Sequence, residues 1–196
     1  MPMEIEIKLA VDVQDLWRLR EALAKPEAEK DLKNLYFDSR DKKLRLQRIM
    51  VRMRTRSSVT GAVLCVKGPS ENRDGVFRAE EHEWNLSTAE ASEFEAKPGS
   101  QALRLDPLIP SGVIHQLEAF GSIRVQRSVY EIASGLYLEL DHVRYSDGSE
   151  DAEMEMEAPE NRLEEARKLL DDLLEKAGVR ARAQEKTKYQ RFLERV

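Results

Sequence analysis

Two carboxylates and an ammonium group alternate with apolar side chains close to the N-terminus, within the stretch from Glu4 to Leu9. Side chains of a β-strand point to opposite faces with a period of two, so Glu4, Glu6 and Lys8 are expected on one face. Carboxylate oxygens suit a hard divalent cation, and a lysine ammonium suits a phosphate oxygen. The strip therefore indicates binding of a metal-complexed polyphosphate, and the alternative is the solvated face of an amphipathic strand.

Charged side chains alternate with apolar ones in four further segments. These are Arg52, Arg54 and Arg56; Glu81 and Glu83; Glu139 and Asp141; and Glu153, Glu155 and Glu157. One interpretation is a sheet with a solvated charged face and with helices over its apolar face. The other turns the charged faces inward to line a tunnel, because opposite charges persist together in an interior where a lone charge cannot. A linear polyphosphate with its metal requires both signs at once.

Length and composition limit the classes of protein. The 196 residues suit a single domain over 1–196, and 41% hydrophobic residues support a real core. A net charge of -5 argues against general nucleic-acid binding. The single cysteine, Cys65, lies in an apolar run and is expected to be a small buried hydrophobe. Because neither a signal peptide nor a membrane-spanning run is recognisable, a soluble cytoplasmic protein is expected.

The order of elements predicts an α+β protein whose eight strands close as one antiparallel β-barrel, a tunnel with helices packed outside. Strands are expected at residues 4–9, 29–37, 44–55, 62–66, 76–86, 122–133, 136–145 and 152–158. Helices are expected after Asp12, after Ser87 with Glu90 completing a capping box, up to Ala119, from Pro159 to Gly178, and from about Gln184. An irregular connection is expected at 97–112 and a polar loop at 70–75.

The ordered motifs resemble those of the CYTH superfamily, the triphosphate tunnel metalloenzymes, from Met3 to Phe192. The N-terminal Glu-x-Glu-x-Lys strip is the anchor of this resemblance. The further matches are Tyr36-Phe37-Asp38, Val51-Arg52-Met53-Arg54, Lys67-Gly68, Glu81-His82-Glu83, Gln126-Arg127, Glu139-Leu140-Asp141, Glu155-Met156-Glu157 and Thr187-Lys188.

The resemblance implies a tunnel that binds a triphosphate group together with a divalent cation, Mg²⁺ or Mn²⁺. Carried over residue by residue, the phosphate-binding residues would be Lys8, Arg52, Arg54, Lys67, Arg127 and Lys188. The metal ligands would be Glu4, Glu6, Asp141, Glu155 and Glu157, with Glu81 and Glu83 as additional acids of the tunnel. Lys8 and Tyr36 are the candidates for assisting the attacking water or the leaving phosphate.

Several assignments stay open at the level of sequence. Arg127 has the same strand parity as Val125 and Val129, so a β-bulge or an irregular twist is expected if it faces the tunnel, and Arg124 is the substitute if the bulge is absent. Lys186 competes with Lys188. The basic run at residues 42–48, which includes Arg45 and Arg48, is expected to be a solvated strand face rather than a nucleic-acid site.

The leading functional hypothesis is a divalent-metal-dependent triphosphatase that hydrolyses a phosphoanhydride bond of inorganic triphosphate or a related organic triphosphate. The alternatives are a class IV-type adenylyl cyclase that makes cyclic AMP from ATP, and a non-catalytic module that binds polyphosphate or nucleotide. The expected partner is a small-molecule triphosphate, without nucleic acid or membrane, and a homodimer is possible.

Overall fold

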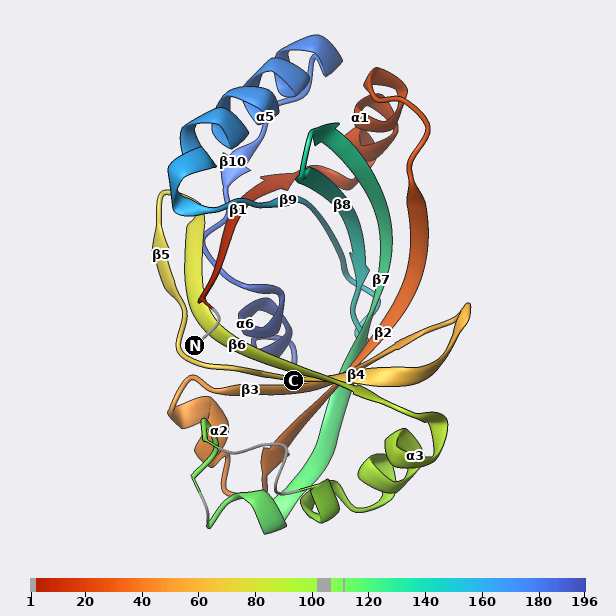
Figure 1. Ribbon diagram of the computed structural model, residues 1–196, viewed down its shortest axis with the longest axis vertical. Helices are drawn as coiled ribbons and strands as arrows, with labels where there is room; N and C mark the ends of the chain where they lie inside the picture. Colours follow the sequence, from red (N-terminus) through yellow and green to blue (C-terminus); the bar gives the residue numbers. More distant parts are fainter. Residues whose placement is uncertain (1–2, 102–106, 111) are drawn as a thin grey trace.

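Eight antiparallel strands of the computed structural model, which describes residues 3–101, 107–110 and 112–196, close into a barrel (Figure 1). They are β1 (Met3–Val11), β2 (Ala28–Ser39), β3 (Met50–Arg56), β4 (Val59–Lys67), β6 (Val76–Leu86), β7 (Leu117–Ala133), β8 (Leu136–Arg144) and β9 (Glu150–Glu157). Their order is β1-β9-β8-β7-β2-β3-β4-β6, and pairing of β1 with β6 completes the ring. The short strands β5 (Glu71–Arg73) and β10 (Arg182–Ala183) lie beside β6 and β1. The predicted α+β barrel is confirmed.

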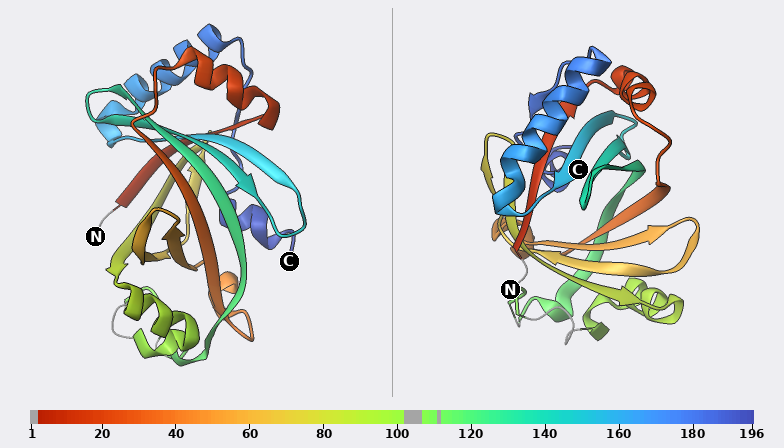
Figure 2. Two further views of the ribbon diagram at one scale, coloured as in Figure 1. Left: turned by 90° about the vertical axis from the view of Figure 1, so that its right-hand side faces the viewer. Right: turned by 45° about the horizontal axis from the view of Figure 1, so that its top comes forward.

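The outward faces of the strands pack under helices on opposite sides of the barrel (Figure 2). Leu140 and Met154 belong to one buried apolar cluster with Leu19 of α1 (Leu16–Ala22) and Leu170 of α5 (Leu163–Ala177). A second cluster lies between β2, β3, β4 and β6 and α3 (Thr88–Ala96), around Phe94. Because apolar residues occupy these outward positions, the alternating charged residues face the interior.

A third apolar cluster lies inside the barrel. The last helix, α6 (Lys188–Leu193), contributes Tyr189 and Phe192 to it, and the strands contribute residues such as Tyr36 and Val125. Tyr36 stacks against both rings of the helix, with centroids 5.0 and 4.9 Å apart. In Figure 1, α6 is seen through the ring of strands. The interior is therefore divided between an aromatic part under α6 and a charged part.

Local signals set the start of α3 and the end of α5 where the sequence predicted them. Ser87 and Glu90 form the reciprocal capping box that begins α3. Pro159 precedes a 3₁₀ turn (Glu160–Arg162) that leads into α5, and Gly178 ends α5 in the left-handed region at φ 63°. A second capping box, between Thr187 and Gln190, begins α6.

Three expected elements differ in the structure. Residues 44–55 do not form one strand, because the Asp38 carboxylate accepts the backbone N–H groups of Leu44 and Arg45 and holds a helical turn, α2 (Lys43–Leu46). The expected helix up to Ala119 is a 3₁₀ turn (Ile114–Gln116), after which β7 begins at Leu117. The last helix begins at Lys188, four residues later than expected.

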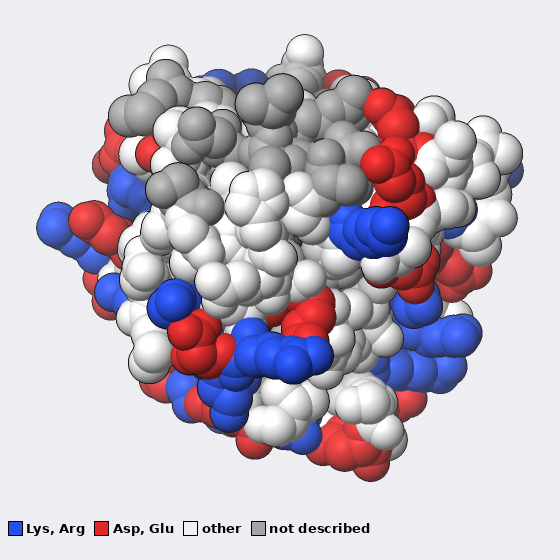
Figure 3. Space-filling view, turned by 90° about the horizontal axis from the view of Figure 1, so that it is seen from below, with Lys and Arg blue, Asp and Glu red and all other residues white. Residues whose placement is uncertain are grey.

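The connection at 97–112 begins with a 3₁₀ turn (Pro98–Gln101), and residues 102–106 and 111 lie outside the described residues. The polar loop at 70–75 contains the short strand β5. In the described part of the chain, none of the helices has the length and apolar character needed to cross a bilayer. Figure 3 shows acidic and basic side chains interspersed over the described part of one face.

Candidate functional site

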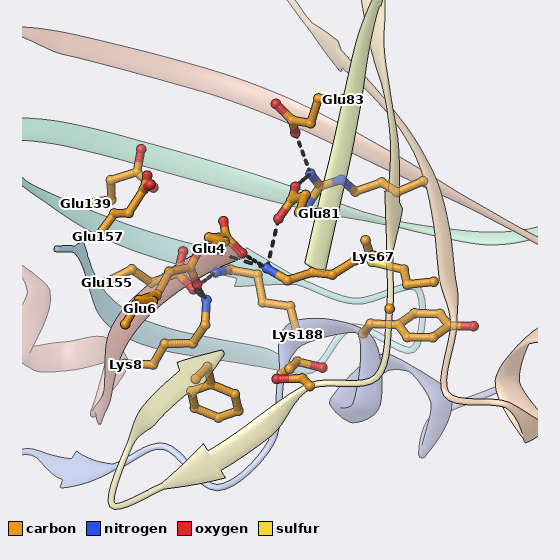
Figure 4. Close-up of a pocket in the computed structure, with 18 of the residues that line it drawn as sticks. Glu4, Glu6, Lys8, Lys67, Glu81, Glu83, Glu139, Glu155, Glu157 and Lys188 are labelled. Carbon is orange, nitrogen blue, oxygen red and sulfur yellow. Dashed lines mark hydrogen bonds and ion pairs between the residues drawn. The ribbon is translucent and has the colours of Figure 1, made fainter. Parts of the chain in front are cut away.

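The charged part of the barrel interior is a cavity of about 1250 Å³. The side chains that line it come from all eight strands of the barrel and from α6 (Figure 4). The predicted residues among them are Glu4, Glu6, Lys8, Tyr36, Arg52, Arg54, Lys67, Glu81, Glu83, Arg127, Glu155, Glu157 and Lys188. Asp141, the one remaining predicted residue, is fully buried and contacts two of the lining cations.

The N-terminal strip lies at the centre of this cavity. Lys8 is opposite Glu155 in the β1–β9 register, and its ammonium forms ion pairs with Glu155 and Glu6. Glu4 forms an ion pair with Lys67 of β4. Burial alone would lower the pKa of Lys8, but the carboxylates of Glu155 and Glu6 raise it above its ordinary value. Lys8 is therefore a permanent cation in the cavity wall.

Three strands (β7, β8 and β9) and α6 converge on a buried ion-pair network beside the strip. Arg127 binds Asp141 through Nε–Oδ1 and Nη2–Oδ2 contacts of 2.7 and 2.6 Å, and it also contacts Glu155 at 2.8 Å. Lys188 lies 2.8 Å from Asp141 and 2.9 Å from Glu155. Burial opposes ionisation of Glu155, but the nearby ammonium groups of Lys188 and Lys8 hold its pKa well below the usual range. Glu155 is thus charged and links three cations.

The opposite wall holds a second network. The guanidinium of Arg52 contacts Glu83 at 3.2 Å and Glu81 at 3.5 Å, and Lys67 lies 2.9 Å from Glu81. Burial opposes ionisation of Glu81, yet Lys67 and Arg52 lower its pKa to about 2. The buried Cys65 thiol donates to Glu81 over 2.9 Å, and burial raises the pKa of the thiol. Cys65 is therefore a neutral buried group, in line with the prediction.

Arg54 differs from the other cations of the cavity. Its Nε donates to the Asn34 side chain over 2.9 Å, and no carboxylate of the described residues lies within ion-pair distance. Burial, reinforced by the neighbouring guanidinium groups of Arg52 and Arg127, lowers the pKa of Arg54 to about 10. A half-buried cation beside other cations and without a counter-ion is unfavourable, and an anion from solution would compensate it.

Carboxylates crowd the cavity at the β9 end. Glu6 and Glu157 are register partners on β1 and β9, and Glu139 and Glu157 lie beside each other in Figure 4. Burial and the neighbouring carboxylate of Glu6 raise the pKa of Glu157. Burial also raises the pKa of Glu139, despite its ion pair with Arg127. Such repulsion among hard oxygen donors fits a divalent cation.

Two groups of possible metal ligands have their donor atoms within 4.8 Å of one another. One comprises Asp141, Glu153 and Glu155, and the other comprises Cys65, Glu81 and Glu83. Only Asp141 and Glu155 of the first group belong to the predicted metal ligands. The chemistry of these donor atoms therefore suits a bound metal ion.

The structure resolves both open choices between neighbouring residues. Lys188 lines the cavity, whereas Lys186 pairs with Glu194 at 2.5 Å among exposed side chains. Arg127 lines the cavity and Arg124 is exposed. The expected bulge is wrong, because β7 is in regular register on both sides of Arg127. Val125 shares the inward face since that part of the interior is apolar and packs against α6.

Sequence reasoning missed several residues of the site. Arg45 and Arg48 line the cavity, so the interpretation of residues 42–48 as a solvated strand face is wrong. Glu153 is fully buried and links Lys188 of α6 to Arg191, which it contacts at 2.9 Å. The alternation of Glu153 with Glu155 was the available signal for Glu153. Arg191 lies on the short helix α6, and no sequence pattern indicated that this helix packs inside the barrel.

Known structures superpose on the chain over almost its whole length. A putative adenylyl cyclase from Hippeastrum, described as having a dominant triphosphatase activity, matches with a TM-score of 0.87 at 25% identity, covering 97% of this chain and 95% of its own. A putative adenylate cyclase from Bacillus halodurans matches with a TM-score of 0.73 at 28% identity, covering 98% and 99%. The PH1819 protein from Pyrococcus horikoshii, with a TM-score of 0.68 at 16% identity over 97% and 99%, shares the fold.

No curated protein matches the sequence. The family model described as CYTH domain matches residues 2–193. This range contains every residue of the two ion-pair networks, and the barrel with its inward charged faces agrees with the match. The chain therefore belongs to the CYTH domain family.

Proposed function

We propose that the protein is a divalent-metal-dependent triphosphatase that hydrolyses a phosphoanhydride bond of inorganic triphosphate or a related organic triphosphate. The observation that carries the proposal is Arg54, a half-buried guanidinium without a carboxylate partner among the described residues, in a cavity that also presents Arg52 and Lys8. Guanidinium groups bind phosphate oxygens through a planar fork of donors. A phosphate oxygen would thus supply the counter-charge that Arg54 lacks among the described residues.

Basic residues on opposite walls would bind and align the phosphate chain. They are Lys8, Arg52, Arg54, Lys67, Arg127 and Lys188. Several of these cations are already paired with carboxylates. Phosphate oxygens that bind them would therefore replace carboxylate oxygens as their partners. Phosphoryl transfer depends chiefly on such alignment and on neutralisation of charge.

Carboxylates of the cavity would hold Mg²⁺ or Mn²⁺. The proposed ligands are Glu4, Glu6, Asp141, Glu155 and Glu157, and Glu81 and Glu83 on the opposite wall are additional candidates. When bound, such an ion neutralises phosphate charge and lowers the pKa of a coordinated water. Among these residues, Glu6 and Glu157 are the best candidates for metal ligands, since a cation would relieve the repulsion between their carboxylates.

Lys8 and Tyr36 have roles set by their protonation states. Because the pKa of Lys8 is raised, its ammonium stabilises charge on the leaving phosphate and does not act as a base. Burial raises the pKa of Tyr36, so its phenol stays neutral and can donate a hydrogen bond to a phosphate oxygen or the attacking water.

The test is phosphate release from inorganic triphosphate with and without Mg²⁺, in the wild type and in Glu6→Ala. We expect release that requires Mg²⁺ and falls at least about 100-fold in Glu6→Ala, as when a charge-stabilising group is removed. Glu95→Ala, an exposed substitution on α3, is the control and keeps full activity. Activity that is indifferent to Mg²⁺ and to Glu6 contradicts the proposal.

A second candidate is supported by the relatives, two of which are described as putative adenylyl or adenylate cyclases. A cyclase would release cyclic AMP and pyrophosphate from ATP, whereas a triphosphatase acting on ATP releases ADP and phosphate. Product analysis after incubation with ATP and Mg²⁺ separates them. Tight binding of triphosphate without any product would instead indicate a non-catalytic binding module.

A further inference from the structure

Four residues that line the cavity form a second polar group, here named the outer cluster. Arg45 lies on α2, Arg48 shortly after it, Ser70 after β4, and Tyr189 on α6. None of them belongs to the predicted phosphate or metal residues. Arg48 and Ser70 are in contact, since Arg48 Nη2 donates to the Ser70 carbonyl over 2.7 Å.

Two hydroxyl groups of the outer cluster have unmet hydrogen-bonding capacity. The Tyr189 side chain is only 8% exposed, and its phenol has no hydrogen-bond partner among the described residues. The buried Ser70 hydroxyl likewise has none there. Leaving a buried polar group unpaired is costly, and such groups are commonly satisfied by a ligand or water. Both hydroxyls can donate to an anion that enters the cavity.

The arginines of the outer cluster also have free donors. Arg45 donates through Nε to Asp38 over 2.9 Å and stacks on Phe120 at 4.4 Å, with no other guanidinium partner in the described chain. Arg48 has no carboxylate partner there, and its backbone is held in the left-handed region at φ 60°. This conformation belongs to the C-terminal cap of α2, in which Arg48 N–H donates to the Arg45 carbonyl and Ile49 N–H to the Leu44 carbonyl.

The position of the outer cluster continues the phosphate-binding residues of the barrel. Arg48 lies two residues before β3, whose inward face then presents Arg52 and Arg54 in order. Basic groups therefore extend from the interior toward the end of the barrel where α2 lies. The cavity of about 1250 Å³ exceeds the usual range of about 300–1,000 Å³ for small-molecule pockets. A chain longer than a triphosphate has room there.

We propose that the outer cluster is a binding subsite for a fourth phosphate group, so that linear inorganic polyphosphates of four or more phosphates are favoured substrates. This inference rests on the proposed triphosphatase function and specifies its substrate class. The guanidinium groups of Arg45 and Arg48 pair with the added phosphate, and the Tyr189 and Ser70 hydroxyls donate to its oxygens. An organic substituent offers none of this charge.

The test compares KM for inorganic triphosphate and tetraphosphate, both with Mg²⁺, in the wild type, Arg48→Asn and Tyr189→Phe. Asparagine tolerates the left-handed backbone of residue 48, and phenylalanine preserves the stacked ring of residue 189. We expect a lower KM for tetraphosphate in the wild type. Each variant raises KM for tetraphosphate about tenfold relative to its KM for triphosphate, as for loss of a charge-assisted hydrogen bond. The control Arg40→Asn, an exposed residue paired with Glu118, leaves the ratio unchanged.

The outcomes separate this inference from the proposed function. If triphosphate itself is not hydrolysed, the triphosphatase proposal fails, and protection of the metal-free protein against thermal unfolding by the two polyphosphates still tests the subsite. If triphosphate is hydrolysed but both variants change KM for the two substrates equally, the subsite proposal is wrong. If the two variants instead raise KM selectively for ATP, the outer cluster binds a nucleoside and the subsite proposal is wrong.

Discussion

Arg127 and Asp141 are register partners on β7 and β8, and their side chains form a two-pronged ion pair inside the barrel. Asp141 has no exposed surface, and Lys188 makes a further contact with it at 2.8 Å. Asp141 thus contacts two buried cations before any ligand enters, and Glu155 contacts both of them as well. This places Asp141 chiefly in support of phosphate-binding residues, whereas Glu157, the register partner of Glu6, forms no ion pair with a described residue.

Removal of the Asp141 carboxylate is expected to destabilise the fold. Asp141→Ala removes one of the three carboxylates around Arg127 and one of the three around Lys188, so the charge of both is less well compensated. Breaking a buried pair costs up to about 3–5 kcal/mol. Urea unfolding of the metal-free protein measures the loss, with Asp172→Ala on the exposed side of α5 as the control. A loss under about 1 kcal/mol, the range of a surface ion pair, would show that Asp141 is not the centre of this network.

The sequence predicted the barrel because its alternation of charged and apolar residues is regular on most strands. At Glu155 and Arg54, for example, period-two spacing is enough to place the side chain inside. The outward faces could also be anticipated, since Leu140 and Met154 have the opposite parity and helices with apolar stripes were available to cover them. The resemblance to CYTH proteins then related the charged face to phosphate chemistry.

What the sequence did not reveal depends on tertiary contacts. The inward position of Arg127 conflicted with its apolar neighbours only because α6 was not known to pack inside the barrel against Val125. Arg45 was assigned to a strand because the capping of α2 by Asp38, several residues earlier, leaves no periodic signal. In both cases a segment distant in sequence or a side-chain cap overrode local pattern.

Loss of the Arg54 guanidinium is expected to impair substrate binding more than folding. Arg54→Met removes a cation that has no carboxylate partner among the described residues, so no buried carboxylate is left unpaired. A charge-assisted hydrogen bond is worth about 1.5–3 kcal/mol, which predicts a fall of kcat/KM for triphosphate by about 10- to 100-fold. Steady-state kinetics measure it, and Arg124→Met, on the exposed side of β7, is the control. Equal effects of the two substitutions would refute the role of Arg54.

The carboxylates at the β9 end predict a pH-dependent effect of metal on stability. Burial and neighbouring carboxylates raise the pKa of Glu157 above its ordinary value of 4.5. Between the ordinary and the raised pKa, the native state keeps a proton that the unfolded state has released. This contribution to stability is fully present below the ordinary pKa and is lost as pH rises through the raised one. Mg²⁺ relieves the repulsion, so the gain in Tm on adding Mg²⁺ grows with pH.

Glu157→Gln isolates this effect. The variant has no charge at this position, so its metal-free Tm falls less with rising pH and its gain from Mg²⁺ is smaller than that of the wild type. Thermal melting across the carboxylate titration range, with and without Mg²⁺, measures both changes. Glu95→Gln on α3 serves as the control. If the gain in Tm from Mg²⁺ is the same at every pH and is equal in the wild type and in Glu157→Gln, Glu157 is not part of the metal site.

Two lysines near the C-terminus provide a comparison within one segment. Lys188 contacts Asp141 and Glu155 at 2.8 and 2.9 Å inside the cavity, whereas Lys186 contacts Glu194 among exposed side chains. Lys188→Gln should therefore raise KM for Mg²⁺-triphosphate about tenfold, because a charged donor to phosphate is lost. Lys186→Gln should change neither KM nor, by more than about 0.5 kcal/mol, the free energy of unfolding.

Kinetics at a temperature well below the melting transition of both lysine variants separate binding from folding. Lys188→Gln also leaves Glu153, Asp141 and Glu155 with less compensation, so some loss of stability accompanies the change in KM. Lys188→Arg keeps the charge and should recover part of the affinity, which a purely structural role would not require. If Lys186→Gln raises KM as much as Lys188→Gln, α6 does not present Lys188 to the substrate.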